Sequence, residues 1–300
     1  MHIETLKVFC DLVETGSFSL AATRNFVTQS AVSQQVRSLE ARYGKRLIER
    51  SKGNVRLTPA GGVLYQAGKE IMQKYQEIED NLRASSHTVM GVVRVATVYS
   101  VGLYEISSPL KKFLRTFPEV NVHLEYTRVN KIYEDVSKGN VDLGLVAYPA
   151  KRPQVTVIPF REDRLTLICS PHHPFAQLKR ISIKKLDREK FVGFERDVPT
   201  RRAVDRVLRG HAVKVQYVME MDNIETIKRA VEIGSGVSIV PEPAVLQEVK
   251  TKTLKALSFT DEILMRPLGI ICKRGRHLTP AVEEFIQLLT DQRTRQQPLQ

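Results

Sequence analysis

Apolar residues recur at spacings of three and four along the first fifteen positions, which predicts an amphipathic helix over 3–15. Gly16 ends this helix, and a serine directly after it can cap a second, short helix over 19–26. A break around the sequence VTQS follows, and a third helix over 30–44 stops at Gly44. Two short helices joined by a tight break are typical of a helix-turn-helix.

The third predicted helix has two chemically different sides. Its apolar side, which can pack on the first two helices, consists of Val32, Val36 and Leu39. Its opposite side carries the hydrogen-bonding residues Ser30, Ser33, Gln34 and Arg37. Side chains of this kind can contact the edges of DNA bases.

Two short β-like segments after Gly44 surround the sequence Lys-Gly-Asn at 52–54, which favours a tight hairpin turn. A basic hairpin that follows a helix-turn-helix is suited to lie against phosphates as a wing. A long helix is then predicted from Ala60 to about Ser86, with Leu64, Ile71 and Ile78 seven residues apart. This heptad-like stripe favours a dimerising helix, and packing on the chain's own domain is the alternative.

Beyond a hinge predicted at 85–91, segments with strand and helix patterns alternate. This alternation predicts parallel strands with crossover helices, arranged as two α/β halves with a cleft between them. Chain crossings between the halves are expected near 147–149 and near Pro267. The predicted domains are a helix-turn-helix at 1–59, a linker helix and hinge at 60–90 and an effector domain at 91–300, whose subdomain I comprises about 91–160 and 268–300 and whose subdomain II comprises about 161–267.

The chain has 300 residues, a formal charge of +13 and a pI near 9.7, which indicates polyanionic or anionic partners. Eight basic and two acidic residues lie between Arg24 and Arg56, either as a DNA-facing surface or as a solvated one. No apolar run is long enough to cross a membrane, and the N-terminus does not resemble an export signal. We therefore expect a cytoplasmic protein.

Sequence motifs for catalysis and metal binding are missing from the chain. Its three cysteines are far apart and are expected to be buried apolar residues, with a redox switch as the alternative. The histidines and cysteines show no metal-ligand spacing, and there is no GxSxG or phosphate-binding GxxxxGK[ST] motif. We expect neither an enzyme nor a bound metal or cofactor.

The segment 6–61 resembles the DNA-binding region of LysR-type transcriptional regulators. The matching residues are Phe9, Gly16, Ser17, Phe18, Ala21, Ala22, Gln29, Ala31, Val32, Ser33, Leu39, Glu40, Gly44, Leu47, Arg50, Leu57, Thr58, Ala60 and Gly61. The segments FPEV, KGNVDLGLV and VEIGSGVSIVP are similar to elements of the family's effector domain, so the resemblance covers nearly the whole chain.

The resemblance implies a winged helix-turn-helix, a long linker helix that forms dimers and a periplasmic-binding-protein-like domain that binds an inducer between its halves. It also implies tetramers built from two dimers, which bind and bend double-stranded promoter DNA. Two positions depart from the family pattern: Ser30 stands where many members have proline, and Gln34 stands where many have arginine. These departures leave the operator sequence open.

Nine residues are expected to contact DNA. Those expected to face the major groove are Gln29, Ser30, Ser33, Gln34 and Arg37. Those expected to contact phosphates are Thr28, Arg50, Lys52 and Arg56. Gln34 can pair with adenine, and Arg37 can either contact guanine or hold a phosphate.

Nine further residues are expected around the effector. By similarity to the family, Ser100 is the first choice, with Thr97 and Tyr99 beside it. The other candidates follow strands, lie at the crossing between halves or begin a helix: Thr127, Arg128, Ala147, Tyr148, Thr200 and Arg201. Helix dipoles do not favour arginines at a helix start, so Arg201 and Arg202 favour an anionic effector, such as a carboxylate or phosphate. The alternative is that both arginines are merely exposed.

A solute-binding protein of a transport system is the alternative function, because the C-terminal two-thirds has that predicted shape. The basic N-terminal module and the lack of an export signal favour the regulator.

Overall fold

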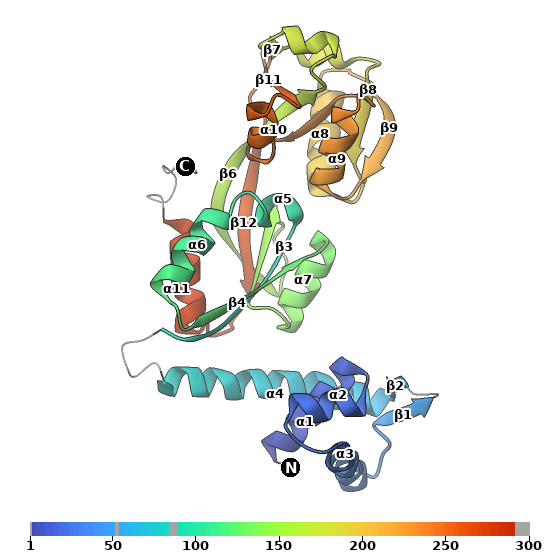
Figure 1. The fold of residues 1–300 in the computed structure, drawn as a ribbon, viewed down its shortest axis with the longest axis vertical. Coiled ribbons are helices and arrows are strands. Elements are labelled where there is room, and N and C mark those ends of the chain that lie inside the picture. Colours follow the sequence, from blue (N-terminus) through green and yellow to red (C-terminus); the bar gives the residue numbers. More distant parts are fainter. Residues whose placement is uncertain (1, 52–53, 84–88, 292–300) are drawn as a thin grey trace. The chain divides into compact units, whose positions relative to one another are not determined.

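The computed structural model describes residues 2–51, 54–83 and 89–291. Its internal contacts divide the chain into two units, Met1–Ser86 and His87–Gln300, which are described separately (Figure 1). Most of the hinge predicted at 85–91 lies outside the described residues.

The first unit contains three short helices, a hairpin and one long helix. Its elements are α1 (Ile3–Thr15), α2 (Phe18–Arg24), α3 (Gln29–Tyr43), β1 (Ile48–Ser51), β2 (Asn54–Leu57) and α4 (Pro59–Arg83). Gly16 and Gly44 end α1 and α3 in the left-handed conformation that glycine adopts readily. Ser17 caps α2 by accepting a hydrogen bond from the backbone N–H of Leu20. The strands β1 and β2 pair antiparallel and form the predicted hairpin.

The apolar sides of α1, α2 and α3 form the core of this unit. Phe9, Leu12 and Val32 are fully buried there, and Leu39 is nearly so. The long helix α4 packs on α1 at Gly68, where an added Cβ would lie 2.9 Å from the sulfur of Cys10. The self-packing that the sequence left open as an alternative is therefore present along part of α4.

A second side of α4 carries exposed apolar residues. Ile71, Tyr75 and Ile78 are exposed and, together with Ile3 and Ala67, line a shallow groove. Ile71 and Ile78 of the predicted heptad-like stripe are thus exposed, whereas Leu64 packs against the core of this unit.

The second unit has two lobes that share the long strands β6 (Val155–Cys169) and β12 (Met265–Lys273). Lobe I adds β3 (Gly91–Thr97), β4 (Val120–Tyr126), β5 (Leu143–Ala147), α5 (Tyr99–Gly102), α6 (Ser107–Thr116), α7 (Val129–Lys138) and α11 (Pro280–Thr290). The helices α6 and α11 cover one face of its sheet, and α7 covers the other (Figure 1).

Lobe II contains the remaining elements of this unit. They are β7 (Arg180–Ile181), β8 (Lys190–Phe194), β9 (Gln216–Met221), β10 (Ser238–Pro241), β11 (Lys255–Phe259), α8 (Pro199–Gly210), α9 (Ile224–Glu232), α10 (Leu246–Lys250) and the short 3₁₀ segments Pro174–Gln177, Ile183–Leu186 and Glu242–Val245. Its core is built by the facing sides of β6, β8, β10 and β11 with α8 and α9.

The strand directions agree with the expected parallel arrangement only in part. The order in the large sheet is β4-β3-β5-β12-β6-β11-β7, with β3 parallel to both β4 and β5, and β8 pairs parallel with β9 in a separate sheet. The shared strand β12, however, runs antiparallel to β5 and to β6. The two α/β lobes are therefore joined by an antiparallel ladder rather than by a continuous parallel sheet.

Candidate functional site

The helix α3 turns its polar side away from the core of the first unit. Val32 and Val36 on its inner side are 0% and 1% exposed. On its outer side Gln29, Ser30, Gln34 and Arg37 are exposed, and Ser33 is half-buried. This side of α3 is open to solvent and can be reached by a ligand as large as double-stranded DNA.

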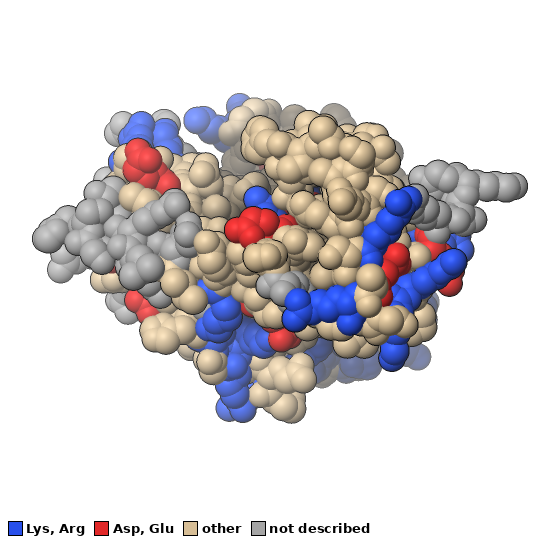
Figure 2. Space-filling model, turned by 90° about the horizontal axis from the view of Figure 1, so that it is seen from below, with Lys and Arg blue, Asp and Glu red and all other residues tan. Residues whose placement is uncertain are grey.

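The predicted phosphate contacts lie at the start of α3 and on the hairpin. Thr28 is exposed and caps α3, because its hydroxyl accepts a hydrogen bond of 3.2 Å from the backbone N–H of Ala31. Arg50 lies on β1 and the exposed Arg56 on β2, whereas Lys52 lies outside the described residues. Seen from below, the molecule shows several groups of Lys and Arg side chains with fewer Asp and Glu between them (Figure 2).

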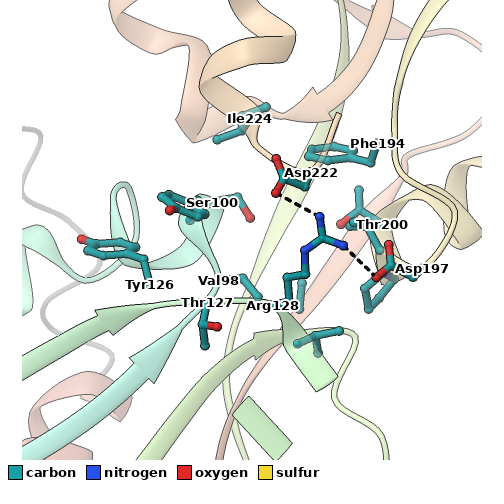
Figure 3. A pocket seen from close by; sticks show the side chains of 15 residues that line it. Val98, Ser100, Tyr126, Thr127, Arg128, Phe194, Asp197, Thr200, Asp222 and Ile224 are labelled. Carbon is teal, nitrogen blue, oxygen red and sulfur yellow. Dashed lines mark hydrogen bonds and ion pairs between the residues drawn. The ribbon is translucent and has the colours of Figure 1, made fainter. Parts of the chain in front are cut away.

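A cleft of about 320 Å³ opens between the lobes of the second unit (Figure 3). Its lining consists of Val98, Tyr99, Ser100, Tyr126, Thr127, Arg128, Val129, Ala147, Phe194, Asp197, Val198, Pro199, Thr200, Asp222 and Ile224. Six of the nine predicted effector residues are therefore in one place: Tyr99, Ser100, Thr127, Arg128, Ala147 and Thr200.

The other three predicted residues do not line the cleft. Thr97 is fully buried and donates its hydroxyl hydrogen to the carbonyl of Val98. Tyr148 packs against the core of lobe I, where burial raises the pKa of its hydroxyl to about 12. Arg201 is only 4% exposed and points into lobe II.

The chain itself supplies partners for the Arg201 guanidinium. It donates to Asp205 at 2.9 Å, to the carbonyl of Phe194 at 2.7 Å and to Glu220 at 3.2 Å. The ring of Tyr217 also lies beneath it, 3.5 Å from the guanidinium carbon. An arginine at this helix start therefore requires no anionic ligand, because two carboxylates of lobe II compensate its charge.

Arg128 extends from lobe I to three carboxylates of lobe II. Its guanidinium lies 3.0 Å from Glu195, 3.6 Å from Asp197 and 3.2 Å from Asp222, and Figure 3 shows it within the cleft. The negative charge of Glu195 raises the pKa of Arg128 above its ordinary value. Asp197 and Asp222 were not predicted from the sequence, although both follow strand ends as Thr127 and Arg128 do.

Ser100 connects the cleft to a buried ion pair on the two shared strands. Its hydroxyl oxygen accepts a hydrogen bond of 2.9 Å from Arg266 on β12. Arg266 is 0% exposed and also binds Asp163 on β6 with two of its nitrogens, at 2.8 Å for Nε. The position of Ser100 thus depends directly on the ladder that joins the lobes.

All three cysteines are free and buried, and burial raises the pKa of Cys10 to about 12 and that of Cys169 to about 11. A raised pKa keeps the thiol protonated at neutral pH, and the protonated form is a poor nucleophile. We therefore expect iodoacetamide at pH 8 to modify native protein far more slowly than urea-unfolded protein, as mass spectrometry would show. Rapid modification of any one cysteine in the native state would contradict this expectation.

Among the described residues no helix is long and apolar enough to cross a membrane. The same part of the chain contains no group of three His, Cys, Asp or Glu side chains suited to hold a metal ion.

Family models match both units of the chain. Residues 3–62 match the bacterial regulatory helix-turn-helix protein of the lysR family, and residues 86–294 match the LysR substrate binding domain. The chain therefore belongs to the LysR family of transcription regulators, with an N-terminal helix-turn-helix and a C-terminal α/β effector-binding domain.

Individual relatives match over most of their length. A probable RuBisCO transcriptional regulator of Cyanidioschyzon merolae is 29% identical over 291 residues, which cover 95% of this chain and 96% of that protein. The crystal structure of full-length CbnR complexed with its target DNA has a TM-score of 0.71 at 19% identity and covers 98% of this chain and 100% of that one. The Synechocystis CcmR regulatory domain in complex with 2-PG has a TM-score of 0.63 at 25% identity and covers 70% of this chain and all of that domain.

Proposed function

We propose that this transcription regulator binds promoter DNA by placing the outer side of α3 in the major groove, with the hairpin against the phosphates. The observation that carries the proposal is the exposed polar side of α3, opposite a side that is buried in the core. Gln29, Ser30, Ser33, Gln34 and Arg37 would face the bases, and Thr28, Arg50, Lys52 and Arg56 would contact phosphates.

A pair of substitutions separates base recognition from phosphate binding. Gln34→Ala should reduce the binding free energy for the operator by about 1–3 kcal/mol and remove the base preference at the one position that Gln34 contacts. Binding to random DNA should remain nearly unchanged. Arg56→Ala should weaken binding to both DNAs alike and flatten the dependence of affinity on salt concentration. Mobility-shift titrations at two salt concentrations measure both effects, with DNA fragments recovered by pull-down as the source of the operator.

Leu20→Ala is a suitable control, because Leu20 is exposed on α2 and outside the proposed DNA surface. Equal losses of Gln34→Ala on operator and random DNA would exclude Gln34 from base recognition. Unchanged affinity and salt dependence for Arg56→Ala would exclude the hairpin from phosphate binding.

The cleft is the proposed site of a small anionic effector. Ser100, Thr127, Arg128 and Thr200 offer hydroxyl and guanidinium donors around one cavity. The bound 2-PG of the CcmR regulatory domain supports a small-molecule effector in this domain. Tyr99 and Ala147 would contact the effector, whereas Thr97, Tyr148 and Arg201 would act from behind the lining.

We further propose that two copies pair along the exposed side of α4 and that two such dimers form a tetramer. The open apolar groove at Ile71, Tyr75 and Ile78 supports the pairing. The proposed domains remain 1–59, 60–90 and 91–300. Regulation of transcription in the cytoplasm, without an enzymatic activity, is consistent with relatives that are themselves transcription regulators.

A further inference from the structure

Negative charge exceeds positive charge at the effector cleft. Arg128 is the single basic residue in the described lining, which also contains Asp197 and Asp222. A third carboxylate, that of Glu195, binds the same guanidinium at 3.0 Å. Three carboxylates thus share one cation, although the whole chain carries a formal charge of +13.

Two arginines near the cleft do not offset this negative charge, because their own carboxylates already pair with them. Arg201 is bound by Asp205 and Glu220 inside lobe II. Arg266 is bound by Asp163 on the shared strands. An effector whose only charged group is anionic would therefore leave the excess carboxylates of the lining without a counter-ion.

Other parts of the same cleft are suited to an anionic group. Thr200 is 3% exposed and lines the cleft, and its hydroxyl has no hydrogen-bond partner among the described residues. It is the second residue of the twelve-residue helix α8, whose N-cap residue Val198 gives no side-chain cap. Ser100 accepts a hydrogen bond from Arg266, so its own hydrogen remains for a ligand oxygen.

From these two sets of groups we infer that the effector is amphoteric, with an anionic group at Ser100 and Thr200 and a positively charged nitrogen at Asp197 and Asp222. Such a nitrogen would pair with the two aspartates alongside Arg128, so that each charged group of the ligand meets groups of opposite charge or hydrogen-bond donors. The inference rests on the proposed effector site and adds a charge class to it. Amino acids and small amino phosphates have the required pair of charges.

Matched pairs of small molecules test the inference on the full-length protein by isothermal titration calorimetry. Glycine, β-alanine and 4-aminobutyrate are compared with glycolate, 3-hydroxypropionate and 4-hydroxybutyrate, which replace the ammonium group with a hydroxyl at the same position. At least one amino acid should bind about tenfold more tightly than its hydroxy acid, as expected for a charge-assisted hydrogen bond. The double variant Asp197→Asn/Asp222→Asn should reduce this preference to less than about twofold.

The aspartates are 45% and 49% exposed, so the double variant is expected to fold. Glu119→Gln/Glu283→Gln removes the same number of carboxylates at exposed positions outside the cleft and should keep the preference. Equal or tighter binding of the hydroxy acids to the unaltered protein would overturn the inference but leave the anionic site in place. Failure of every probe to bind would overturn the anionic site together with the inference.

Discussion

Arg266→Met is expected to destabilise the second unit by about 3–5 kcal/mol, because it leaves a buried carboxylate without its counter-ion. Asp163 is 6% exposed and Arg266 is 0% exposed, so water cannot replace the lost partner. Glu105 lies nearby, and burial together with the charge of Asp163 already raises its pKa. Urea unfolding followed by circular dichroism measures the change as a shift of the midpoint.

The double variant Asp163→Leu/Arg266→Met distinguishes the unpaired charge from a simple loss of contacts. Removal of both charges should restore most of the stability, because apolar residues replace a buried ion pair at little cost. If the double variant is as unstable as Arg266→Met, the damage comes from lost packing rather than from the unpaired carboxylate.

Ser100→Phe is expected to abolish the response to the effector without weakening DNA binding. The aromatic ring would fill the part of the cleft that lies against α5, and the hydroxyl bonded to Arg266 would be lost. Operator affinity should remain within about twofold, because Ser100 belongs to a different unit from α3. The measurement is expression from the regulated promoter across growth conditions, alongside mobility shifts.

Thr251→Phe adds the same ring at an exposed position beyond α10 and should respond normally. An unaltered response of Ser100→Phe would remove Ser100 from the effector site. Equal loss of DNA binding in both phenylalanine variants would instead indicate a general folding defect.

Local patterns in the sequence predicted the first unit well. The spacing of apolar residues placed α1 and the buried side of α3, and Gly16 and Gly44 placed their C-terminal ends. Thr127 and Arg128 were likewise predicted because they directly follow a strand, and both line the observed cleft. Each of these features depends on residues that are close together in the chain.

Features that depend on distant partners were not predicted. The strand β6 begins at Val155 and continues through the charged run Arg161–Arg164, and its full length was not predicted from the sequence. One residue of this run, Asp163, is buried because Arg266 lies opposite it in the next strand. Glu220, which also binds Arg201, was missed for the same reason, since it lies on a separate strand. Asp205, by contrast, lies only four residues from Arg201 on α8.

The close contact of α4 with α1 sets a geometric constraint on the operator. Gly68 brings the two helices so near that a methyl group in its place would meet Cys10 and Leu6. Because α3 shares a core with α1, it is also held at a fixed place along α4. If two copies pair along α4, the distance between their two α3 helices is therefore set by the protein. The two half-sites of the operator must then be separated by a matching distance, and must face the same side of the double helix.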